Sequence, residues 1–383
     1  MDFRLTPEQT VLQDVAFNLA QDRLSGLGNS PEGRRAGARI LAEAGLTGIT
    51  LPVSSGGQGG SLMDAIVVMQ AAARADTNAG DMVQGTNFGA VRQVEAFGSP
   101  ELKQEFLPGI LCGDVDIAAA MSEPEAGSSL TGLKTSARIE GDEIVINGGK
   151  IWSDLHATHF AVWARFGESN RDIGCVLVPT DHPGVSRGPA ESFMSGDQYS
   201  ALYFDDVRVP SRYLLNGGGE VRDMMAVFGV ERIGNAARAV AMGWAAYEKA
   251  VEYAKVREQF GRPLCEFQGL QWKFADMRQK LDAAQLLVYR AASNSDRDGV
   301  PDSNEVSIAK CFANESAFWV ANEALQIFGA AGYSTENPME YFVRRTRGWM
   351  IAGGSTEILR NKIAEGIFER RFPQWAPRPE RVG

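Results

Sequence analysis

Apolar residues in the first 115 positions recur every three or four residues, which is the spacing of amphipathic helices. Four such stretches begin just after a hydroxyl residue, at Thr6, Ser30, Ser61 and Ser99. Three of these four residues are followed directly by proline, and a hydroxyl residue before proline is typical of a helix start. The pattern therefore predicts an N-terminal helical domain over residues 1–115.

Between residues 116 and 222 the pattern changes to short runs rich in Val, Ile, Phe and Tyr. One turn, Glu140-Gly141-Asp142, joins two of these runs directly and favours a hairpin. No G-x-G-x-x-G sequence follows any of the runs, so a doubly wound dinucleotide-binding domain is not expected. We instead predict a central antiparallel β domain, with strands at Leu133–Ile139, Glu143–Ile146, His159–Arg165, Ile173–Pro179 and Ser200–Val207.

Residues 223–383 return to helical spacing, and here the pattern is most regular. One helix is expected between Asn304 and Phe328, ended by Gly329, and the last helix starts near Ser355. We predict a C-terminal four-helix bundle, and hence an α+β multidomain fold of three domains. The apolar positions with strict three-four spacing are Phe267, Leu270, Phe274, Met277, Leu281, Ala284, Val288 and Ala291.

Charge and composition narrow the classes of function. Lysines and arginines number 38 against 48 aspartates and glutamates, giving a net charge of −10, so nucleic acid is not an expected partner. The N-terminal residues resemble neither a signal peptide nor a transit sequence, and no apolar run approaches the ~20 residues of a membrane span. We therefore expect a cytoplasmic protein without membrane contact.

Metal-binding patterns are also sparse. The four cysteines stand far apart, and the chain has three histidines. His156 and His159 have a spacing that suits two metal ligands on one strand, but no further ligand stands near them in the sequence. No metal site is expected.

Several short motifs, in a fixed order over about residues 2–370, resemble those of the acyl-CoA dehydrogenase family of flavoproteins. Each motif is weak alone, and their common order is what carries the resemblance. The motifs are Leu51-Pro52, Gly56-Gly57-Gln58-Gly59, Met121 to Ser128, Phe204 to Pro210, Arg257 to Gly261, Phe267-Gln268 and Gln326 to Gly329.

This resemblance implies a helical domain, a β domain and a helical bundle, assembled as a homotetramer that binds FAD. It implies an acyl-CoA substrate and an electron-transfer flavoprotein as electron acceptor. Met121 and Ser122 would meet the edge of the flavin ring, and Trp152 and Ser153 resemble the pair that flanks it. The segment from Lys150 to Arg165 is about two residues shorter than the family pattern.

Residues of the bundle are assigned by the same resemblance to the FAD of a neighbouring subunit. Arg257 would lie near the pyrophosphate. The other residues assigned to FAD are Ser128, Phe260, Gln268, Gln326, Gly329, Ser355 and Glu357. Contacts with the substrate are expected from Ser128, Arg232 and Gly354.

Dehydrogenation of an acyl thioester needs a carboxylate base that removes the α-proton. Many family members place a glutamate at the position that is Gly353 here, so this chain has no base there. Other members place it on the first bundle helix, where Glu231 matches. We expect Glu231 to be the base, with main-chain N–H groups near Gly353 holding the thioester oxygen. The alternative is that Glu231 pairs with Arg232 or caps the helix.

Other functions on the same fold remain open. Relatives act on carrier-protein thioesters, desulfinate acyl-CoAs, or work as flavin oxidases or monooxygenases. The bundle motifs resemble the sulfinopropionyl-CoA desulfinase branch, which is expected to lack the base at both positions, so Glu231 favours dehydrogenation. Asp81 falls near the place of the sulfinate-holding arginine of that branch. A catalytically silent subunit is the third reading.

Overall fold

The computed structural model describes residues 4–169, 172–219 and 221–372. Its first third is helical, as predicted, because hydroxyl side chains cap the helices. The oxygens of Thr6, Ser30, Ser61 and Ser99 each accept a hydrogen bond from a main-chain N–H three residues on. The helices are α1 (Pro7–Leu19), α2 (Pro31–Glu43), α3 (Leu62–Ala75), α4 (Thr77–Asn87), α5 (Ala90–Phe97) and α6 (Pro100–Cys112).

The helices α4 and α5 were not predicted from the sequence. Asp76 ends α3 and also caps α4, so the two helices join without a turn that the sequence pattern would reveal. Glycine and polar residues fill α4, yet most of them are buried against its neighbours. Short π or 3₁₀ segments complete the irregular parts, at Ala20–Leu24, Val53–Ser55, Leu130–Gly132, Ser211–Tyr213 and Leu264–Glu266.

Nine strands form one sheet in the middle of the chain, in the order β6-β8-β3-β2-β4-β5-β9, with β1 beside β4 and β7 beside β8. Most pairs are antiparallel, as predicted, but β4 pairs in parallel with β1 and, at one position, with β2. The strands are β1 (Ile117–Ala120), β2 (Ser136–Glu140), β3 (Glu143–Asp154), β4 (His159–Arg165), β5 (Ile173–Pro179), β6 (Val185–Arg187), β7 (Glu191–Ser192), β8 (Gln198–Pro210) and β9 (Leu214–Asn216).

The last part is helical again. The helix α9 begins and ends within one residue of the predicted bounds, and α8 contains the predicted apolar positions from Leu270 to Ala291. Two shorter helices, α11 and α12, take the place of a fourth long helix in the bundle, and both pack on α9. The helices are α7 (Val221–Val256), α8 (Gln268–Asp298), α9 (Ser303–Phe328), α10 (Ala330–Tyr333), α11 (Pro338–Trp349) and α12 (Thr356–Ile367). A small hairpin, β10 (Glu258–Gln259) with β11 (Arg262–Pro263), follows α7.

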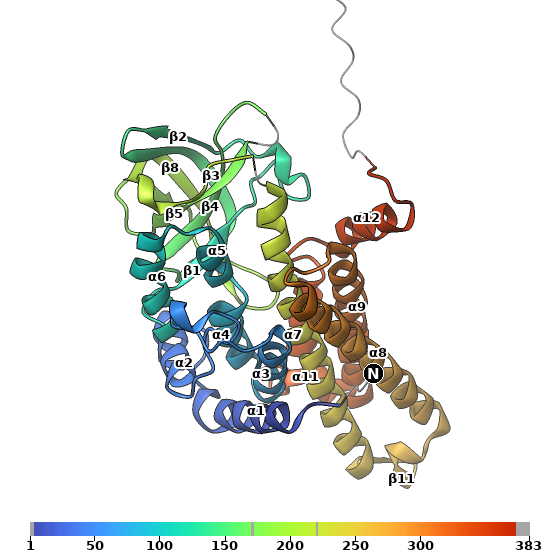
Figure 1. Cartoon of the computed structure of the whole chain (residues 1–383). Coiled ribbons are helices and arrows are strands. Elements are labelled where there is room, and N and C mark those ends of the chain that lie inside the picture. Colours follow the sequence, from blue (N-terminus) through green and yellow to red (C-terminus); the bar gives the residue numbers. More distant parts are fainter. Residues whose placement is uncertain (1–3, 170–171, 220, 373–383) are drawn as a thin grey trace, which may run out of the picture.

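Figure 1 shows the sheet above the N-terminal helices, with the long helices of the bundle beside both. The regions share hydrophobic cores, since α3 is almost wholly buried and packs against α7 and α8. Residues 1–3 and 373–383 of the predicted terminal domains lie outside the described residues. No helix in the described ranges is long and apolar enough to cross a membrane.

Candidate active site

The segments expected at the flavin edge lie side by side in the sheet region. The Ile151 N–H donates to the carbonyl of Ser122 at 2.9 Å, and the Lys150 ammonium donates to the carbonyl of Met121 at 3.2 Å. Residues 121–122, which follow β1, are thereby held against the middle of β3. The sequence prediction that Met121, Ser122, Trp152 and Ser153 belong to one site agrees with this placement.

A buried ion pair supports both segments. The Lys150 ammonium contacts the Glu123 carboxylate at 2.8 Å, and the two side chains are 0% and 7% exposed. The main-chain N–H groups of Lys134 and Thr135 also donate to Glu123. Burial acts to raise the pKa of Glu123, but these donors hold it below its usual value. Burial lowers the pKa of Lys150, against the opposing effect of Glu123.

Trp152 and Ser153 have the features of residues that hold a flat ligand. The β3–β8 register shifts between Lys150 and Ser153, and Trp152 has a φ of 62°, a conformation that few residues other than glycine adopt. The Trp152 indole stays 52% exposed beside Phe193 and Tyr199. The buried hydroxyl of Ser153 has no hydrogen-bond partner among the described residues.

The opposite end of the bundle holds five of the other residues assigned to FAD, namely Arg257, Phe260, Gln268, Gln326 and Gly329. Arg257 and Phe260 belong to the α7–α8 connection, whose hairpin is at the lower right of Figure 1, far from the sheet. Phe260 is 94% exposed with a φ of 53°, and Arg257, Gln268 and Gln326 are exposed as well. The stacked rings of Tyr253 and Phe328, 4.1 Å apart, bring the ends of α7 and α9 together.

Within one chain, therefore, the residues assigned to FAD at the sheet and those at the far end of the bundle form two separate groups, and Ser355 and Glu357 lie apart from both at the start of α12. Gly329 has a φ of 63° and open space around its Cα, so the main chain at that point is accessible. Ser128 is exposed on the loop after β1. Both groups are chemically suited to a dinucleotide, one with an aromatic edge and an unpaired hydroxyl, and the other with a guanidinium and amides.

Glu231 lies in the first third of α7, where that helix meets α4 and the turn between α11 and α12. Its carboxylate has no hydrogen bond or ion pair within the described part of the chain. Burial raises the pKa of Glu231 to about 6, against the opposing effects of Arg238 and Arg232. Because α7 begins ten residues earlier, Glu231 does not cap the helix, and the predicted alternatives for this residue both fail.

Arg232 does not pair with Glu231, and it binds the main chain of the turn between α11 and α12. Its Nε donates to the Gly353 carbonyl at 2.9 Å, and its guanidinium lies 5.3 Å from the centre of the Phe228 ring. Gly353 and Gly354 have φ values of 71° and 96°, which side chains strongly disfavour. In this turn a glutamate at Gly353 would be strained.

The start of α12 carries Ser355 and Glu357, two of the residues assigned to FAD. Ser355 caps the helix by accepting from the Ile358 N–H at 3.4 Å. Glu357 is exposed in the first turn, where its own main-chain N–H and Ser355 lower its pKa. A carboxylate with a low pKa is a poor base, so Glu357 is a weaker candidate for the catalytic group than Glu231.

Sequence reasoning missed a charge cluster beside this site. Asp81 on α4 is bound by Arg238 of α7 through one carboxylate oxygen and by Arg345 of α11 through the other. Arg345 also pairs with Asp197, in the segment before β8. The partners are up to 264 residues apart, so no local pattern reveals them. The cluster joins all three regions of the fold.

Gln84, which the sequence offered with Asp81 and Arg92 as a residue that lines the substrate pocket or is solvated, lies one turn further along α4. Its Nε2 donates to the Glu231 carbonyl at 3.4 Å. A Cβ placed on Gly234 would lie 2.6 Å from Gln84 Oε1, so the glycine lets the two helices approach closely. The face of α7 that carries Glu231 and Arg238 is thus packed against α4.

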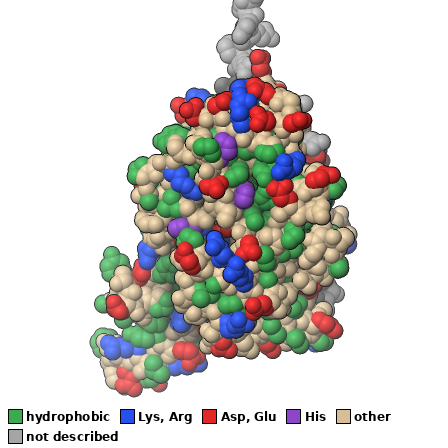
Figure 2. Space-filling model, turned by 90° about the vertical axis from the view of Figure 1, so that its left-hand side faces the viewer, with side chains coloured by type: hydrophobic (Ala, Val, Ile, Leu, Met, Phe, Trp, Pro, Cys, Tyr) green, Lys and Arg blue, Asp and Glu red, His purple; other side chains and the backbone are tan. Residues whose placement is uncertain are grey.

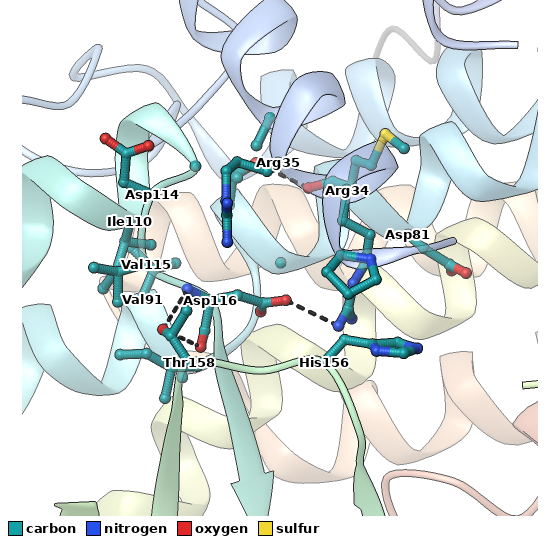
Figure 3. Close-up of a pocket in the computed structure, with 18 residues that line it drawn as sticks. Arg34, Arg35, Asp81, Val91, Ile110, Asp114, Val115, Asp116, His156 and Thr158 are labelled. Atoms are coloured by element: carbon teal, nitrogen blue, oxygen red, sulfur yellow. Dashed lines mark hydrogen bonds and ion pairs between the residues drawn. The ribbon is translucent and has the colours of Figure 1, made fainter. Parts of the chain in front are cut away.

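A pocket of about 100 Å³ lies on the other side of α4, between α2, α6 and the start of β1. Figure 3 shows Arg34 turned toward Asp116, with which it pairs at 3.2 Å. Arg34 also pairs with Asp154 at 2.8 Å. Burial raises the pKa of Asp116, and Arg34 opposes that effect. Asp114 and Asp81, which also line the pocket, pair with arginines outside it.

The face shown in Figure 2 carries basic and acidic side chains in alternation rather than in one continuous patch of either sign. In the described ranges, no three His, Cys, Asp or Glu side chains gather in the manner of metal ligands.

The order of the three regions and the aromatic edge beside an unpaired hydroxyl are those of a flavin-dependent oxidoreductase. Residues 6–114, 118–207 and 218–368 match the family models described as the N-terminal, middle and C-terminal domains of acyl-CoA dehydrogenase. The chain therefore belongs to the acyl-CoA dehydrogenase family.

Individual relatives span nearly the same length. A 3-sulfinopropanoyl-CoA desulfinase of Advenella mimigardefordensis is 35% identical, covering 97% of this chain and 96% of the relative. A probable acyl-CoA dehydrogenase, fadE25, of Mycobacterium leprae is 34% identical over 86% of each protein. The butyryl-CoA dehydrogenase of Megasphaera elsdenii has a similar structure, with a TM-score of 0.89 and 30% identity over 97% of this chain and 100% of that one.

Members of this family bind FAD, and a related fold, a glutaryl-CoA dehydrogenase of Mycobacterium smegmatis, has been solved with FADH2. The exposed indole of Trp152 and the partnerless Ser153 hydroxyl fit such a group. Trp152, Ser153, Met121 and Ser122 would hold its ring portion.

Proposed function

We propose that this protein is an FAD-dependent acyl-CoA dehydrogenase that forms a 2-enoyl-CoA, with Glu231 as the base. The observation that carries the proposal is the unpaired Glu231 carboxylate, whose pKa burial raises to about 6. A carboxylate with a pKa near the working pH is suited to accept a proton from carbon. Its neighbour, the turn at Gly353, offers main-chain N–H groups.

In this proposal the ionised Glu231 removes the proton from the α-carbon of the thioester. The N–H groups of the turn stabilise the negative charge that develops on the thioester oxygen. FAD, when bound, accepts the hydride that leaves the β-carbon. Packing of Gln84 and Gly234 at the α4–α7 contact fixes the helix from which Glu231 projects.

The assembly and the electron acceptor are part of the same proposal. Val256, Phe260 and Trp272, near the hairpin after α7, are 76%, 94% and 62% exposed. Large exposed apolar side chains of this kind favour contact with another protein surface. We infer that they meet a second copy of the chain, whose FAD receives Arg257, in a homotetramer. An electron-transfer flavoprotein is the proposed acceptor of the electrons.

Desulfination is the second candidate, favoured by the 35% identity with 3-sulfinopropanoyl-CoA desulfinase. Asp81 counts against it, because a carboxylate held by two arginines occupies the place expected for a single sulfinate-binding arginine.

The proposal is tested by anaerobic titration of the purified flavoprotein with straight, branched and dicarboxylic acyl-CoAs and with 3-sulfinopropanoyl-CoA. We expect at least one plain acyl-CoA to bleach the flavin absorbance and to yield its 2-enoyl-CoA. Release of sulfite from 3-sulfinopropanoyl-CoA, with no bleaching by any other thioester, would replace dehydrogenation by desulfination. Purification without flavin would point to a silent subunit.

A further inference from the structure

The turn between α11 and α12 is held by side chains that bind its carbonyl oxygens. The Lys310 ammonium, on α9, donates to the carbonyls of Trp349 at 3.2 Å and Gly354 at 3.0 Å. The Asn314 amide, one turn further on, donates to Trp349 at 2.6 Å. With the Arg232 bond to Gly353, three carbonyls of the turn point into the bundle.

The direction of these carbonyls sets the direction of the N–H groups. In a trans peptide the C=O and the following N–H point in opposite directions. Because the carbonyls of Gly353 and Gly354 accept from the Arg232 and Lys310 side chains, the N–H groups of Gly354 and Ser355 point away from those two side chains. Neither N–H has a partner among the described residues. They are free to bind an oxygen on the other side of the turn.

A lysine as deeply buried as Lys310 is unusual in a contact that serves only to hold a turn in place. It is 0% exposed and lies on the apolar face of α9, near Val306, Ala309 and Ala313. No carboxylate pairs with it in the described ranges, and a buried charge without an anionic partner is unfavourable. The charged or titratable groups that act on it are Arg232 of α7 and Cys311 of α9. The turn presents only carbonyls to it.

We propose that Lys310 is a positioning residue, whose ammonium holds and polarises the peptide between Gly354 and Ser355 so that the turn's N–H groups bind the thioester oxygen. This inference rests on the function proposed above. A cation on a carbonyl oxygen draws charge through the peptide and strengthens its N–H as a donor. A charge-assisted bond is also about twice as strong as a neutral one. The protonated form of Lys310 is therefore the active form.

The charge of Lys310 is lost in an accessible range of pH. Burial lowers the pKa of Lys310 to about 8, and Arg232 acts in the same direction. Above that pH the neutral amine polarises the peptide less, so kcat is expected to fall. Arginine at this position stays protonated at every pH at which the enzyme is stable.

The test compares K310R and K310M with K249M, which alters an exposed lysine of α7. We expect K310M to lose roughly 10–10²-fold in kcat at pH 7, the size of effect that misplacement by about 1 Å produces. K310R is expected to keep most of the activity and to lose the fall in kcat above pH 8. Wild type and K249M are expected to show that fall. An unchanged fall in K310R would overturn the proposal.

Amide hydrogen exchange supplies a readout that does not depend on turnover. We expect peptides that span residues 350–356 to exchange faster in K310M than in K249M, because the Gly354 carbonyl loses its donor and the Trp349 carbonyl keeps only Asn314. If no acyl-CoA is dehydrogenated by wild type but exchange accelerates in K310M, the proposed function fails while the positioning of the turn stands. Unchanged exchange in K310M would refute the positioning role.

Discussion

Replacing Glu231 by glutamine is expected to reduce the rate of flavin reduction by roughly 10²–10⁴-fold while FAD stays bound. Glutamine has nearly the same shape but cannot accept the α-proton. Glu231 has no hydrogen bond or ion pair among the described residues, so its replacement leaves no partner unsatisfied. Stopped-flow measurement of flavin bleaching with a good acyl-CoA substrate gives the rate of this step directly.

The matched control is E336Q, at an exposed glutamate between α10 and α11. It is expected to reduce flavin at the wild-type rate. The folded protein binds the Glu231 proton more tightly than the unfolded chain does, so ionisation of Glu231 lowers stability as pH rises through about 6. E231Q removes that effect and should be no less stable at pH 7. Near wild-type flavin reduction in E231Q would exclude Glu231 as the base.

The assignment of Glu231 as the base also predicts how kcat/KM changes with pH on the acid side. Because the ionised carboxylate is the active form, kcat/KM is expected to rise with pH through about 6 and then to level off. E231Q should lack this rise. With the loss of the Lys310 charge above pH 8, the wild-type profile is expected to be bell-shaped.

Much of the fold was predictable because local signals and the global structure agree. Hydroxyl caps at Thr6, Ser30, Ser61 and Ser99 start helices where the periodicity begins, and Gly329, with a φ of 63°, ends α9 where expected. Such features act over three or four residues, which is the range that a single sequence reveals. The parallel β1–β4 pair lies beyond that range, since its residues stand about 40 positions apart.

The site could be predicted only in part, for the same reason. The order of the motifs identified Glu231, Trp152 and Arg257 as candidate site residues. It did not reveal the side chains from distant helices that surround Glu231. Lys310 gave one weak signal, a charge in the apolar face of a regular helix, whose meaning depends on a turn 39 residues away. The Asp81 cluster gave no signal, because its arginines come from helices far along the chain.

Removal of the Lys150 ammonium is expected to destabilise the protein more than any other single change described here. The K150M variant leaves the Glu123 carboxylate 7% exposed without its cation, and breaking a buried ion pair in this way costs about 3–5 kcal/mol. Lysine and methionine have similar lengths, so lost packing contributes little. Urea unfolding, followed by circular dichroism, measures the change in the free energy of unfolding.

Two further variants test whether the loss of stability in K150M comes from the buried, uncompensated charge of Glu123. K134M removes the cation from the neighbouring pair of Lys134 with Glu125, whose side chains are 74% and 70% exposed, and no measurable change in stability is expected. Adding E123Q to K150M removes the uncompensated charge. The Lys134 and Thr135 N–H groups donate to different oxygens of Glu123, so the glutamine keeps an acceptor for only one of them, and only part of the lost stability should return. K150M unfolding at the wild-type urea concentration would contradict the role of the pair. FAD retention should fall in parallel with stability, because Lys150 also binds the Met121 carbonyl and so ties the segment before Glu123 to β3.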